Sequence, residues 1–379
     1  MTNEMNWKER NVIVTGGASF IGSHLVDRLC ARGAIVTVFD NLSSGTVQNL
    51  SRSPNIKFLN IDLECSTIDR IVSDFRGNEI VFHLAATHGG RGYIDSHPAD
   101  VCSNFSIDHN VFKSAYLAGV DKVVFASSAC VYPPRLQENF GSDYLLTEAD
   151  SDAAKLSGPL GADLEYGWAK LMAEVQLNAF IKQYGLRGAV LRFVTAYGER
   201  ENETHSIVAL IHKAHERMNP FVVWGNGEQS RDFTYVSDIV EGTLLAAEKI
   251  SDGTPINLGT GQRFKLKEVA TIINDIIGYR PRIVYDMMKP VGVANRALDI
   301  RRAQELLGWK PKVALMDGLR RTVYWYVKTH PQTGYVNESS LVERMPMVHP
   351  QIGSKQLETQ FFNMLLSDSN ANLAGEEKR

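Results

Sequence analysis

The run Val-Ile-Val-Thr-Gly-Gly-Ala-Ser-Phe-Ile-Gly at residues 12–22 places a glycine turn directly after a short apolar stretch. Its β-branched start predicts a buried strand, and Leu25, Val26 and Leu29 follow at helical spacing. A glycine turn between a strand and a helix lets the backbone approach a phosphate, which the free N–H groups of the helix then bind. The run therefore predicts a phosphate-binding turn in an α/β fold.

A second strand is predicted at residues 35–39, and it ends in Asp40. Strand, glycine turn, helix, strand and acid follow one another in the dinucleotide-binding arrangement. The Asp40 carboxylate would bind ribose hydroxyls and repel a 2′-phosphate, so we expect NAD rather than NADP. The alternative is a glycine turn in some other α/β fold.

Tyr166 and Lys170 are four residues apart, which places them on one face of a helix. An ammonium group there would lower the pKa of the phenol, which is about 10 in free tyrosine. Ser128, at the end of a predicted strand, could share the same substrate oxygen. The three residues suit removal of a proton from an alcohol whose hydride leaves for a nicotinamide. The alternative is that Tyr166 and Lys170 are only a pair on the surface of a helix, without a catalytic role.

With these motifs the chain resembles the extended short-chain dehydrogenase/reductases that act on nucleotide sugars, over about residues 10–330. Further marks of that family are the segments 62–63, 83–86, 192–198 and 225–233, and Arg296 ahead of residues 307–309. The resemblance implies a cofactor site formed by Gly16, Ser19, Phe20, Ile21, Gly22, Asp40, Asn41, Asp62, Leu63, Leu84, Ala85, Ala86, Tyr166 and Lys170. It implies substrate contacts from Ser128, Thr195, Arg231 and Arg296, with the two arginines on the diphosphate.

Three features depart from the family pattern. Ser19 replaces the middle glycine of the turn, and Thr195 stands where an asparagine is usual. The interval between Ser128 and Tyr166 is also long, which indicates an inserted loop at about residues 135–164. This loop is either a lid on the site or a solvated excursion.

Cys130 narrows the chemistry, because family members that dehydrate or decarboxylate a sugar carry an acid at this position. A cysteine followed by Val-Tyr-Pro resembles the GDP-mannose 3,5-epimerases and GDP-fucose synthases, which use it as an acid/base. A ketone at sugar carbon 4 makes the protons on carbons 3 and 5 acidic, and a thiol with a pKa of about 8.5 can exchange them. The alternative is a small buried residue that only fills space.

Inversion also needs a second group, on the opposite face of the sugar. His205 is the candidate, because residues 204–211 resemble the segment that carries the catalytic histidine of GDP-fucose synthase. An imidazole with a pKa near 6.5 suits the role. Lys213 is a weaker candidate, further along the predicted helix, and an exposed histidine at a helix start is the alternative for His205.

Composition indicates a soluble protein that binds neither nucleic acid nor membrane. The 379 residues are 44% hydrophobic, and the formal net charge is −3. No apolar run approaches the roughly 18 residues of a membrane span. The four cysteines are scattered, which predicts no metal site, no disulfide framework and a cytoplasmic location.

The pattern predicts a Rossmann-like doubly wound parallel sheet over residues 1–190, which binds NAD and carries the Ser, Tyr and Lys residues. Residues 191–330 should form a smaller substrate domain with returns to the sheet, including helices at 207–217, 237–250, 266–277 and 317–330. Helices at about 104–118 and 166–184 should pair with their copies in a homodimer, as in relatives. The tail, 331–379, is expected to be partly disordered, or to dock on a partner through a short helix at 357–366.

The sequence thus predicts an enzyme with tightly held NAD that epimerises a nucleotide sugar, of the GDP-mannose 3,5-epimerase type. A GDP-sugar is favoured by Trp224, ahead of the 225–227 turn, and a UDP-sugar is the alternative. A 4-epimerase, in which Cys130 is a bystander, is the alternative reaction. A non-catalytic NAD-binding regulator is the alternative from another class.

Overall fold

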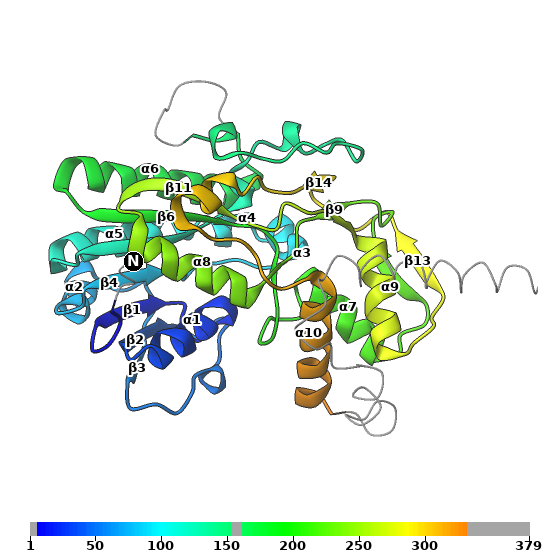
Figure 1. The fold of residues 1–379 in the computed structure, drawn as a ribbon, viewed down its shortest axis with the longest axis horizontal. Coiled ribbons are helices and arrows are strands. Elements are labelled where there is room, and N and C mark those ends of the chain that lie inside the picture. The colour runs from blue at the N-terminus through cyan, green and yellow to red at the C-terminus, as the bar shows by residue number, and fades with distance from the viewer. Residues whose placement is uncertain (1–5, 153–160, 332–379) are drawn as a thin grey trace, which may run out of the picture.

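The centre of the molecule is a seven-stranded parallel sheet (Figure 1), in a computed structural model that describes residues 6–152 and 161–331. Its strands are β1 (Asn11–Thr15), β2 (Ile35–Asp40), β3 (Ile56–Asn60), β4 (Ile80–His83), β5 (Lys122–Ser128), β6 (Arg187–Phe193) and β11 (Asp252–Leu258). Their order is β11-β6-β5-β4-β1-β2-β3, so the chain changes direction across the sheet between β3 and β4. Such a switch opens a crevice at the carboxyl ends of the strands, where ligands bind. The predicted doubly wound sheet is confirmed.

β1 shows that the sheet is buried on both faces. Val12 and Val14 belong to the hydrophobic cluster under α1 (Phe20–Ala31) and α8 (Val236–Lys249), whereas Ile13 belongs to the cluster on the other face. Successive residues of a strand point to opposite faces, so three consecutive apolar side chains can all be buried.

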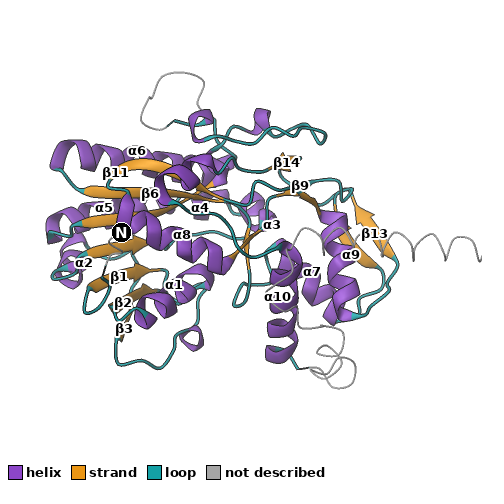
Figure 2. Ribbon diagram, viewed as in Figure 1, coloured by secondary structure: helices purple, strands orange, loops and turns teal. Residues whose placement is uncertain are grey.

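The second face is covered by α2 (Ile68–Phe75), α5 (Asn104–Ala118) and α6 (Leu164–Tyr184), and Figure 2 shows the resulting three layers. α5 has its predicted limits, and α6 begins two residues before Tyr166. Gly185 ends α6 with a φ of 73°, the left-handed conformation that closes helices and that glycine adopts without strain.

A smaller region lies beyond the carboxyl ends of the strands (Figure 1). Its helices are α7 (Ser206–His215), α9 (Leu266–Ile277) and α10 (Leu315–Thr329). Its strands are the parallel pair β8 (Phe221–Trp224) and β13 (Ile283–Asp286), and the sheet β12 (Phe264–Lys265), β9 (Ser230–Arg231) and β14 (Asn295–Arg296). The pair β7 (Ala196–Tyr197) and β10 (Thr234–Tyr235) joins this region to the large sheet.

All four helices predicted after residue 200 are present, with ends that differ by at most two residues from those expected. The expected return to the sheet is made by α8 and β11, and β11 pairs with β6. The remaining short elements are α3 (Arg91–Ser96), α4 (Pro98–Val101), the 3-10 turns η1 (Val47–Asn49), η2 (Ala129–Val131), η3 (Pro134–Leu136) and η4 (Glu148–Asp150), and the π-turn η5 (Ala303–Leu307).

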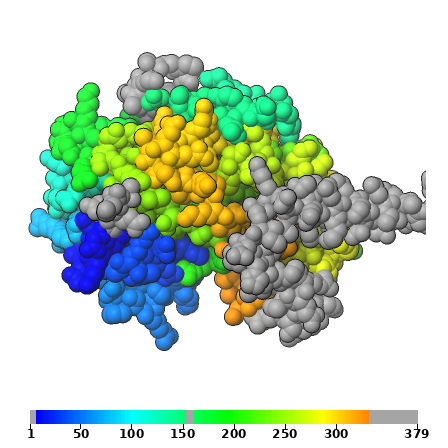
Figure 3. Space-filling model, in the orientation of Figure 1, coloured from blue at the N-terminus to red at the C-terminus, as the bar shows by residue number. Residues whose placement is uncertain are grey.

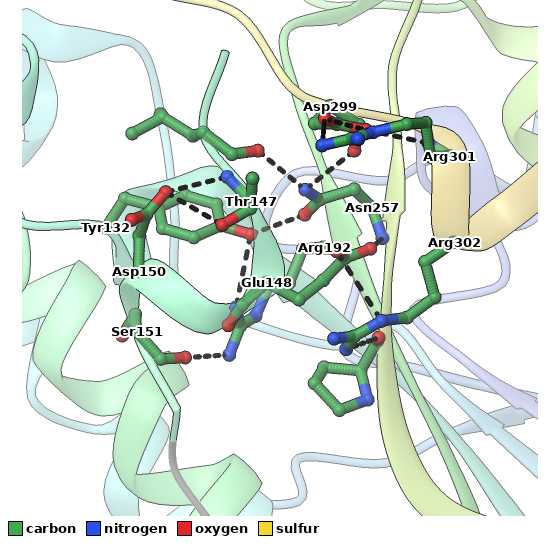
Figure 4. A network of polar contacts seen from close by, with 12 residues as sticks. Tyr132, Thr147, Glu148, Asp150, Ser151, Arg192, Asn257, Asp299, Arg301 and Arg302 are labelled. Atoms are coloured by element: carbon green, nitrogen blue, oxygen red, sulfur yellow. Dashed lines mark hydrogen bonds and ion pairs between the residues drawn. The ribbon is translucent and has the colours of Figure 1, made fainter. Parts of the chain in front are cut away.

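The described part of the 135–164 insertion is fastened to the sheet by a buried polar network (Figure 4). The fully buried guanidinium of Arg192 donates to the carbonyl oxygens of Glu148, at 3.1 Å, and Ser151, at 2.5 Å. The backbone N–H of Asn257 donates to Oε1 of Glu148 at 2.9 Å. This stretch is therefore anchored to the sheet, and it runs in teal along one edge of the molecule in Figure 3. Residues 153–160 lie outside the described residues.

Among the described residues, no helix is long and apolar enough to cross a membrane. The predictions for the tail, including the short helix at 357–366, fall on residues outside this range.

Candidate active site

A cavity of about 860 Å³ opens at the carboxyl ends of β1, β4, β5 and β6 and is closed by the smaller region. A second cavity, of about 70 Å³, lies beside β2 and shares Gly16, Ser19 and Leu84 with the first. The shared wall makes the two cavities parts of one elongated site.

The turn between β1 and α1 closes so tightly that two of its glycines cannot be replaced. Gly16 has a φ of 69°, and a Cβ there would lie 2.8 Å from the backbone nitrogen of Ala85. At Gly22, a Cβ would lie 2.1 Å from the carbonyl oxygen of Gly16. Ser19 is the N-cap residue of α1, and its Oγ lies 3.3 Å from Oδ2 of Asp40. The serine thus preserves the turn and adds a hydroxyl contact.

Asp40 is held rigidly at the end of β2, on the wall of the smaller cavity. Its carboxylate accepts hydrogen bonds from the backbone N–H groups of Ala18, at 3.0 Å, and Leu42, at 2.8 Å. These bonds fix the oxygens where ribose hydroxyls would meet them.

Asp62 lies on the same wall, together with Asn41, Leu63, Ala85 and Ala86. Burial opposes the charge of Asp62, but hydrogen bonds from Asn41 Nδ2, at 3.0 Å, and from the backbone of the following turn outweigh it and lower the pKa.

Ser128, Tyr166 and Lys170 meet on the wall of the large cavity. Ser128 is hydrogen-bonded to the Tyr166 hydroxyl and lowers its pKa, but burial, Cys130 and Asp108 outweigh this and raise it. Lys170 Nζ lies 6.0 Å from the centre of the Tyr166 ring. The expectation that Lys170 lowers the pKa of Tyr166 is wrong for this structure, because burial dominates.

A buried chain of polar groups behind Lys170 was not predicted. His83 Nε2 lies 2.9 Å from Oδ1 of Asp108, and His83 Nδ1 lies 2.7 Å from the Thr15 hydroxyl. The same hydroxyl accepts the backbone N–H groups of Leu84, at 3.2 Å, and the residue after it. Asp108 Oδ1 is 4.0 Å from Lys170 Nζ, so the chain supports the lysine and the start of the 84–86 segment together.

Cys130 lies at the cavity wall and is paired with an arginine. Arg296 donates from Nη1 to Cys130 Sγ, at 3.2 Å, and from Nη2 to Oδ2 of Asp163, at 2.8 Å. The other Asp163 oxygen accepts from Arg91, at 2.9 Å. Burial opposes the charge of Arg296, but Cys130 and Asp163 outweigh it and raise the pKa.

Arg231 is the second predicted arginine, and it lines the same cavity. Its guanidinium donates to the carbonyl oxygens of Ser230 and Val291, at 2.8 and 2.7 Å. Burial, together with the charge of Arg296, lowers the pKa of Arg231 to about 9.

His205 lies across the cavity as the N-cap residue of α7, and Thr195 lines the cavity as well. Burial and the neighbouring His88 lower the pKa of His205 to about 3. Lys213 also reaches the cavity, but its ammonium donates to the carbonyl oxygen of Val222 at 2.8 Å. Lys213 is therefore engaged by the backbone, whereas Nδ1 of His205 has no hydrogen-bond partner among the described residues.

The residues present fit NAD. The first turn of α1 contains no acid, so its N–H groups can donate hydrogen bonds to a pyrophosphate. The Lys170 ammonium is almost fully buried at the cavity wall, and Nζ has no hydrogen-bond partner among the described residues. A nicotinamide ribose would supply the missing acceptor, and Asp40 would bind the other ribose.

The structure thus brings the predicted site residues together around two adjoining cavities. The large cavity holds Gly16, Ser19, Phe20, Ile21, Gly22, Leu84, Ser128, Cys130, Tyr166, Lys170, Thr195, His205, Arg231 and Arg296, and the small cavity holds Asp40, Asn41, Asp62, Leu63, Ala85 and Ala86.

The sequence reasoning missed His88, Glu201 and Asp108. His88 follows the strand end at residues 83–86 by two residues, and this position was the available signal. Asp108 and Glu201 stand out only through burial, which the sequence does not display.

Comparison with known proteins identifies the family to which the chain belongs. Residues 12–259 match the model of the NAD dependent epimerase/dehydratase family. UDP-glucose 4-epimerase of Mycolicibacterium smegmatis is 31% identical over 319 residues, which are 83% of this chain and 97% of that protein. GDP-mannose 3,5-epimerase 1 of Oryza sativa subsp. japonica is 31% identical over 335 residues, covering 86% of this chain and 84% of that protein.

The solved structure of UDP-glucose 4-epimerase from Thermotoga maritima, with UDP-glucose, is similar throughout. It has a TM-score of 0.76 and 33% sequence identity, and the match covers 84% of this chain and 99% of that chain. The same fold, the family match and a site that fits the cofactor agree, which sets aside a non-catalytic regulator. The chain belongs to the NAD-dependent epimerase/dehydratase family and is an enzyme that uses NAD.

Proposed function

We propose that the enzyme epimerises a nucleotide sugar by transient oxidation at carbon 4 and proton exchange at carbon 5, carbon 3 or both. This is the reaction type of GDP-mannose 3,5-epimerase. The observation that carries the proposal is that a thiol, Cys130, and an imidazole, His205, line the same cavity as Tyr166. A 4-epimerase needs neither group.

The first step uses the residues on the sheet side of the cavity. Tyr166 takes the proton of the hydroxyl at carbon 4, and Ser128 hydrogen-bonds the same oxygen. Bound NAD would supply the acceptor, and later the donor, for the hydride of carbon 4. Lys170 offers its ammonium, which has no hydrogen-bond partner among the described residues, to the cofactor ribose.

The second step uses the two walls of the cavity. Once carbon 4 is a ketone, an enolate can form toward carbon 3 or carbon 5. Cys130 exchanges a proton on one face of the sugar, and negative charge on its sulfur would lie against the Arg296 guanidinium. His205 serves the opposite face.

Arg231 and Arg296 bind the diphosphate, because guanidinium forks match phosphate oxygens. Trp224 lies on the same cavity wall, and Lys289 Nζ is 5.7 Å from the centre of its ring. We prefer a GDP-sugar as the substrate. A UDP-sugar is the alternative, because UDP-glucose 4-epimerases are among the relatives named above.

A homodimer is proposed from the surfaces of α5 and α6. Exposed large apolar side chains on these helices are Phe105, Tyr116, Leu117, Trp168, Met172 and Tyr184. An apolar surface of two adjacent helices suits burial against its own copy. The four cysteines are free thiols, which suits the cytoplasm.

A 4-epimerase is the second candidate, favoured by the 33% identity to the Thermotoga maritima enzyme. In that reaction only a hydride moves, and Cys130 is a bystander.

Reaction in heavy water separates the two. With a panel of GDP- and UDP-sugars, the proposed reaction places deuterium on carbon 3 or carbon 5 of the product, and carbon 4 keeps its hydrogen. Cys130→Ala should suppress this exchange and still permit transient reduction of the nicotinamide. An active substrate whose product carries no carbon-bound deuterium would establish the 4-epimerase instead.

A further inference from the structure

Three polar side chains stand side by side on the cavity wall at the start of α7, each with an unpartnered atom. Nδ1 of His205, Nδ1 of His88 and Oε2 of Glu201 lack hydrogen-bond partners among the described residues. Oε1 of Glu201 lies 3.8 Å from His205 Nδ1, and the ring centres of His88 and His205 are 5.7 Å apart. An unpartnered buried polar atom costs about 1–3 kcal/mol, so three together suggest a function.

Burial shifts the pKa values of two of these groups. Burial and His88 lower the pKa of His205 to about 3, so its ring resists becoming a cation. Burial raises the pKa of Glu201 well above its ordinary value, although a hydrogen bond from the backbone of Gly198 opposes this. Burial therefore disfavours a negative charge on Glu201 and a positive charge on His205.

A lone His205 would have to carry a positive charge in this surrounding to act as a base, or become an anion to act as an acid. Both are unfavourable in a buried place. A neighbour that exchanges a proton with the second ring nitrogen keeps the ring neutral, and the neighbour then carries the charge.

We propose that Glu201 is the positioning and proton-holding partner of His205. As Nε2–H of His205 gives its proton to the enolate carbon, the Glu201 carboxyl gives its own proton to Nδ1. A C–H bond and an Nδ1–H bond form, an Nε2–H bond and an O–H bond break, and the negative charge moves from the enolate to the carboxylate. The reverse transfers remove a proton from carbon. The inference rests on the proposed function.

Glu201 and His205 are neighbours, as this step requires, but they are not in hydrogen-bond contact in this structure. At 3.8 Å the Glu201 and His205 atoms are beyond hydrogen-bond distance, and catalytic hydrogen bonds of free enzymes commonly tighten when substrate binds. The His205 side chain is 30% exposed, and it lines the cavity, so its other nitrogen is accessible to a sugar. His88 packs at a steep angle, 65°, against the ring and limits its rotation.

The test compares Glu201→Gln with Glu203→Gln. Glutamine keeps the size of Glu201 but cannot release a proton. Glu203 lies on the same loop and also lines the cavity, but its carboxylate accepts a hydrogen bond from the hydroxyl of Tyr326 and forms no hydrogen bond or ion pair with His205 in the described part of the chain, so it is the matched control. Three quantities are measured: bound NAD, transient absorbance of reduced nicotinamide, and deuterium incorporation at sugar carbon from heavy water.

We expect Glu201→Gln to slow deuterium incorporation by about 10²- to 10⁴-fold, the range for loss of an acid/base, with unchanged NAD content and nicotinamide reduction. Glu203→Gln should behave as wild type. His205→Gln should lose as much exchange as Glu201→Gln, and the double variant no more, because residues that act as a unit are not additive.

Exchange at the wild-type rate in Glu201→Gln overturns the relay while leaving the proposed function intact. Loss of nicotinamide reduction together with exchange also overturns it, since Glu201 would then only support the site. Absence of carbon-bound deuterium in the wild-type product overturns the proposed function, and the relay with it.

Discussion

Arg231 and Arg296 occupy directly paired positions in the adjacent parallel strands β9 and β14. Two guanidinium groups at paired positions repel each other. Arg296 has the carboxylate of Asp163 as a partner, whereas Arg231 forms no ion pair within the described residues. A doubly charged anion between them would relieve the repulsion between the buried Arg296 and the half-buried Arg231.

Arg231→Gln should therefore weaken binding of the sugar nucleotide by about 10- to 100-fold, because a hydrogen bond to a charged group contributes about 1.5–3 kcal/mol. Calorimetric titration gives the dissociation constant. Arg263→Gln is the control, since Arg263 precedes the neighbouring strand β12 but does not line the cavity. If both variants weakened binding of the sugar nucleotide equally, the effect would come from the removal of a positive charge in general and not from the loss of a phosphate contact.

Asp40 should determine the choice of cofactor. Its carboxylate is fixed by Ala18 and Leu42, so it cannot turn away from a 2′-phosphate. Wild type should bind NAD more tightly than NADP by at least about tenfold, and Asp40→Asn should narrow the ratio, as measured by fluorescence titration of both cofactors. Similar affinities for the two cofactors in wild type would contradict the role of Asp40.

Tyr166→Phe should reduce turnover by about 10²- to 10⁴-fold while NAD and the sugar nucleotide stay bound, because it removes a proton acceptor and almost no volume. Product formation is followed by chromatography and bound NAD by absorbance after denaturation. Tyr184→Phe, at the exposed end of the same helix, should keep full activity. Normal turnover in Tyr166→Phe would reduce Tyr166 to a structural residue.

Prediction from the sequence succeeded where a local pattern has one physical meaning. The run at residues 12–22 requires a tight turn, and Gly22 indeed lies against the carbonyl of Gly16. It failed for Tyr166, because helical spacing gives the position of Lys170 but not the burial that raises the pKa of the phenol. Glu201 and Asp108 were missed for the same reason, because the sequence does not show whether an acidic side chain is buried or exposed to solvent.

The ion pair between Glu174 and Arg192 should matter for stability. Both side chains are buried, and Arg192 donates from Nη2 to Glu174 Oε2 at 2.7 Å. Glu174→Gln leaves a buried guanidinium without its counter-charge and should lower the free energy of unfolding by about 3–5 kcal/mol in urea denaturation. Arg301→Gln, which breaks the pair between the exposed Arg301 and Asp299 in the same area (Figure 4), should leave the free energy of unfolding almost unchanged.

Stability should also depend on pH through His205. Its folded pKa is lowered to about 3 from an ordinary 6.5, so below pH 6.5 the unfolded chain binds a proton that the folded chain refuses. The free energy of unfolding therefore falls as the pH drops. Relative to His205→Gln, wild type should lose at most about 1.4 kcal/mol per pH unit between pH 6.5 and 5.

Other groups near His205 affect this measurement. Burial and Lys170 lower the pKa of His88, so His88 also makes the free energy of unfolding fall as the pH drops. The pKa of Glu201 is raised, so its contribution changes with pH in the opposite direction. The comparison of the two proteins by urea denaturation at each pH isolates His205. Parallel curves for wild type and His205→Gln would show that the ring takes up its proton in the folded state.

The pairing of β11 with β6 has a consequence for biosynthesis. A nascent chain that has emerged as far as β6 contains six of the seven strands of the sheet. The outer edge of β6 then has no strand beside it, and the apolar face under α8 is exposed. Both are covered only after residue 258 has left the ribosome. Open strand edges and bare apolar faces attract other chains. We therefore expect the nucleotide-binding half to depend on α8 and β11 for its stability, and its incomplete form to be prone to association with other chains.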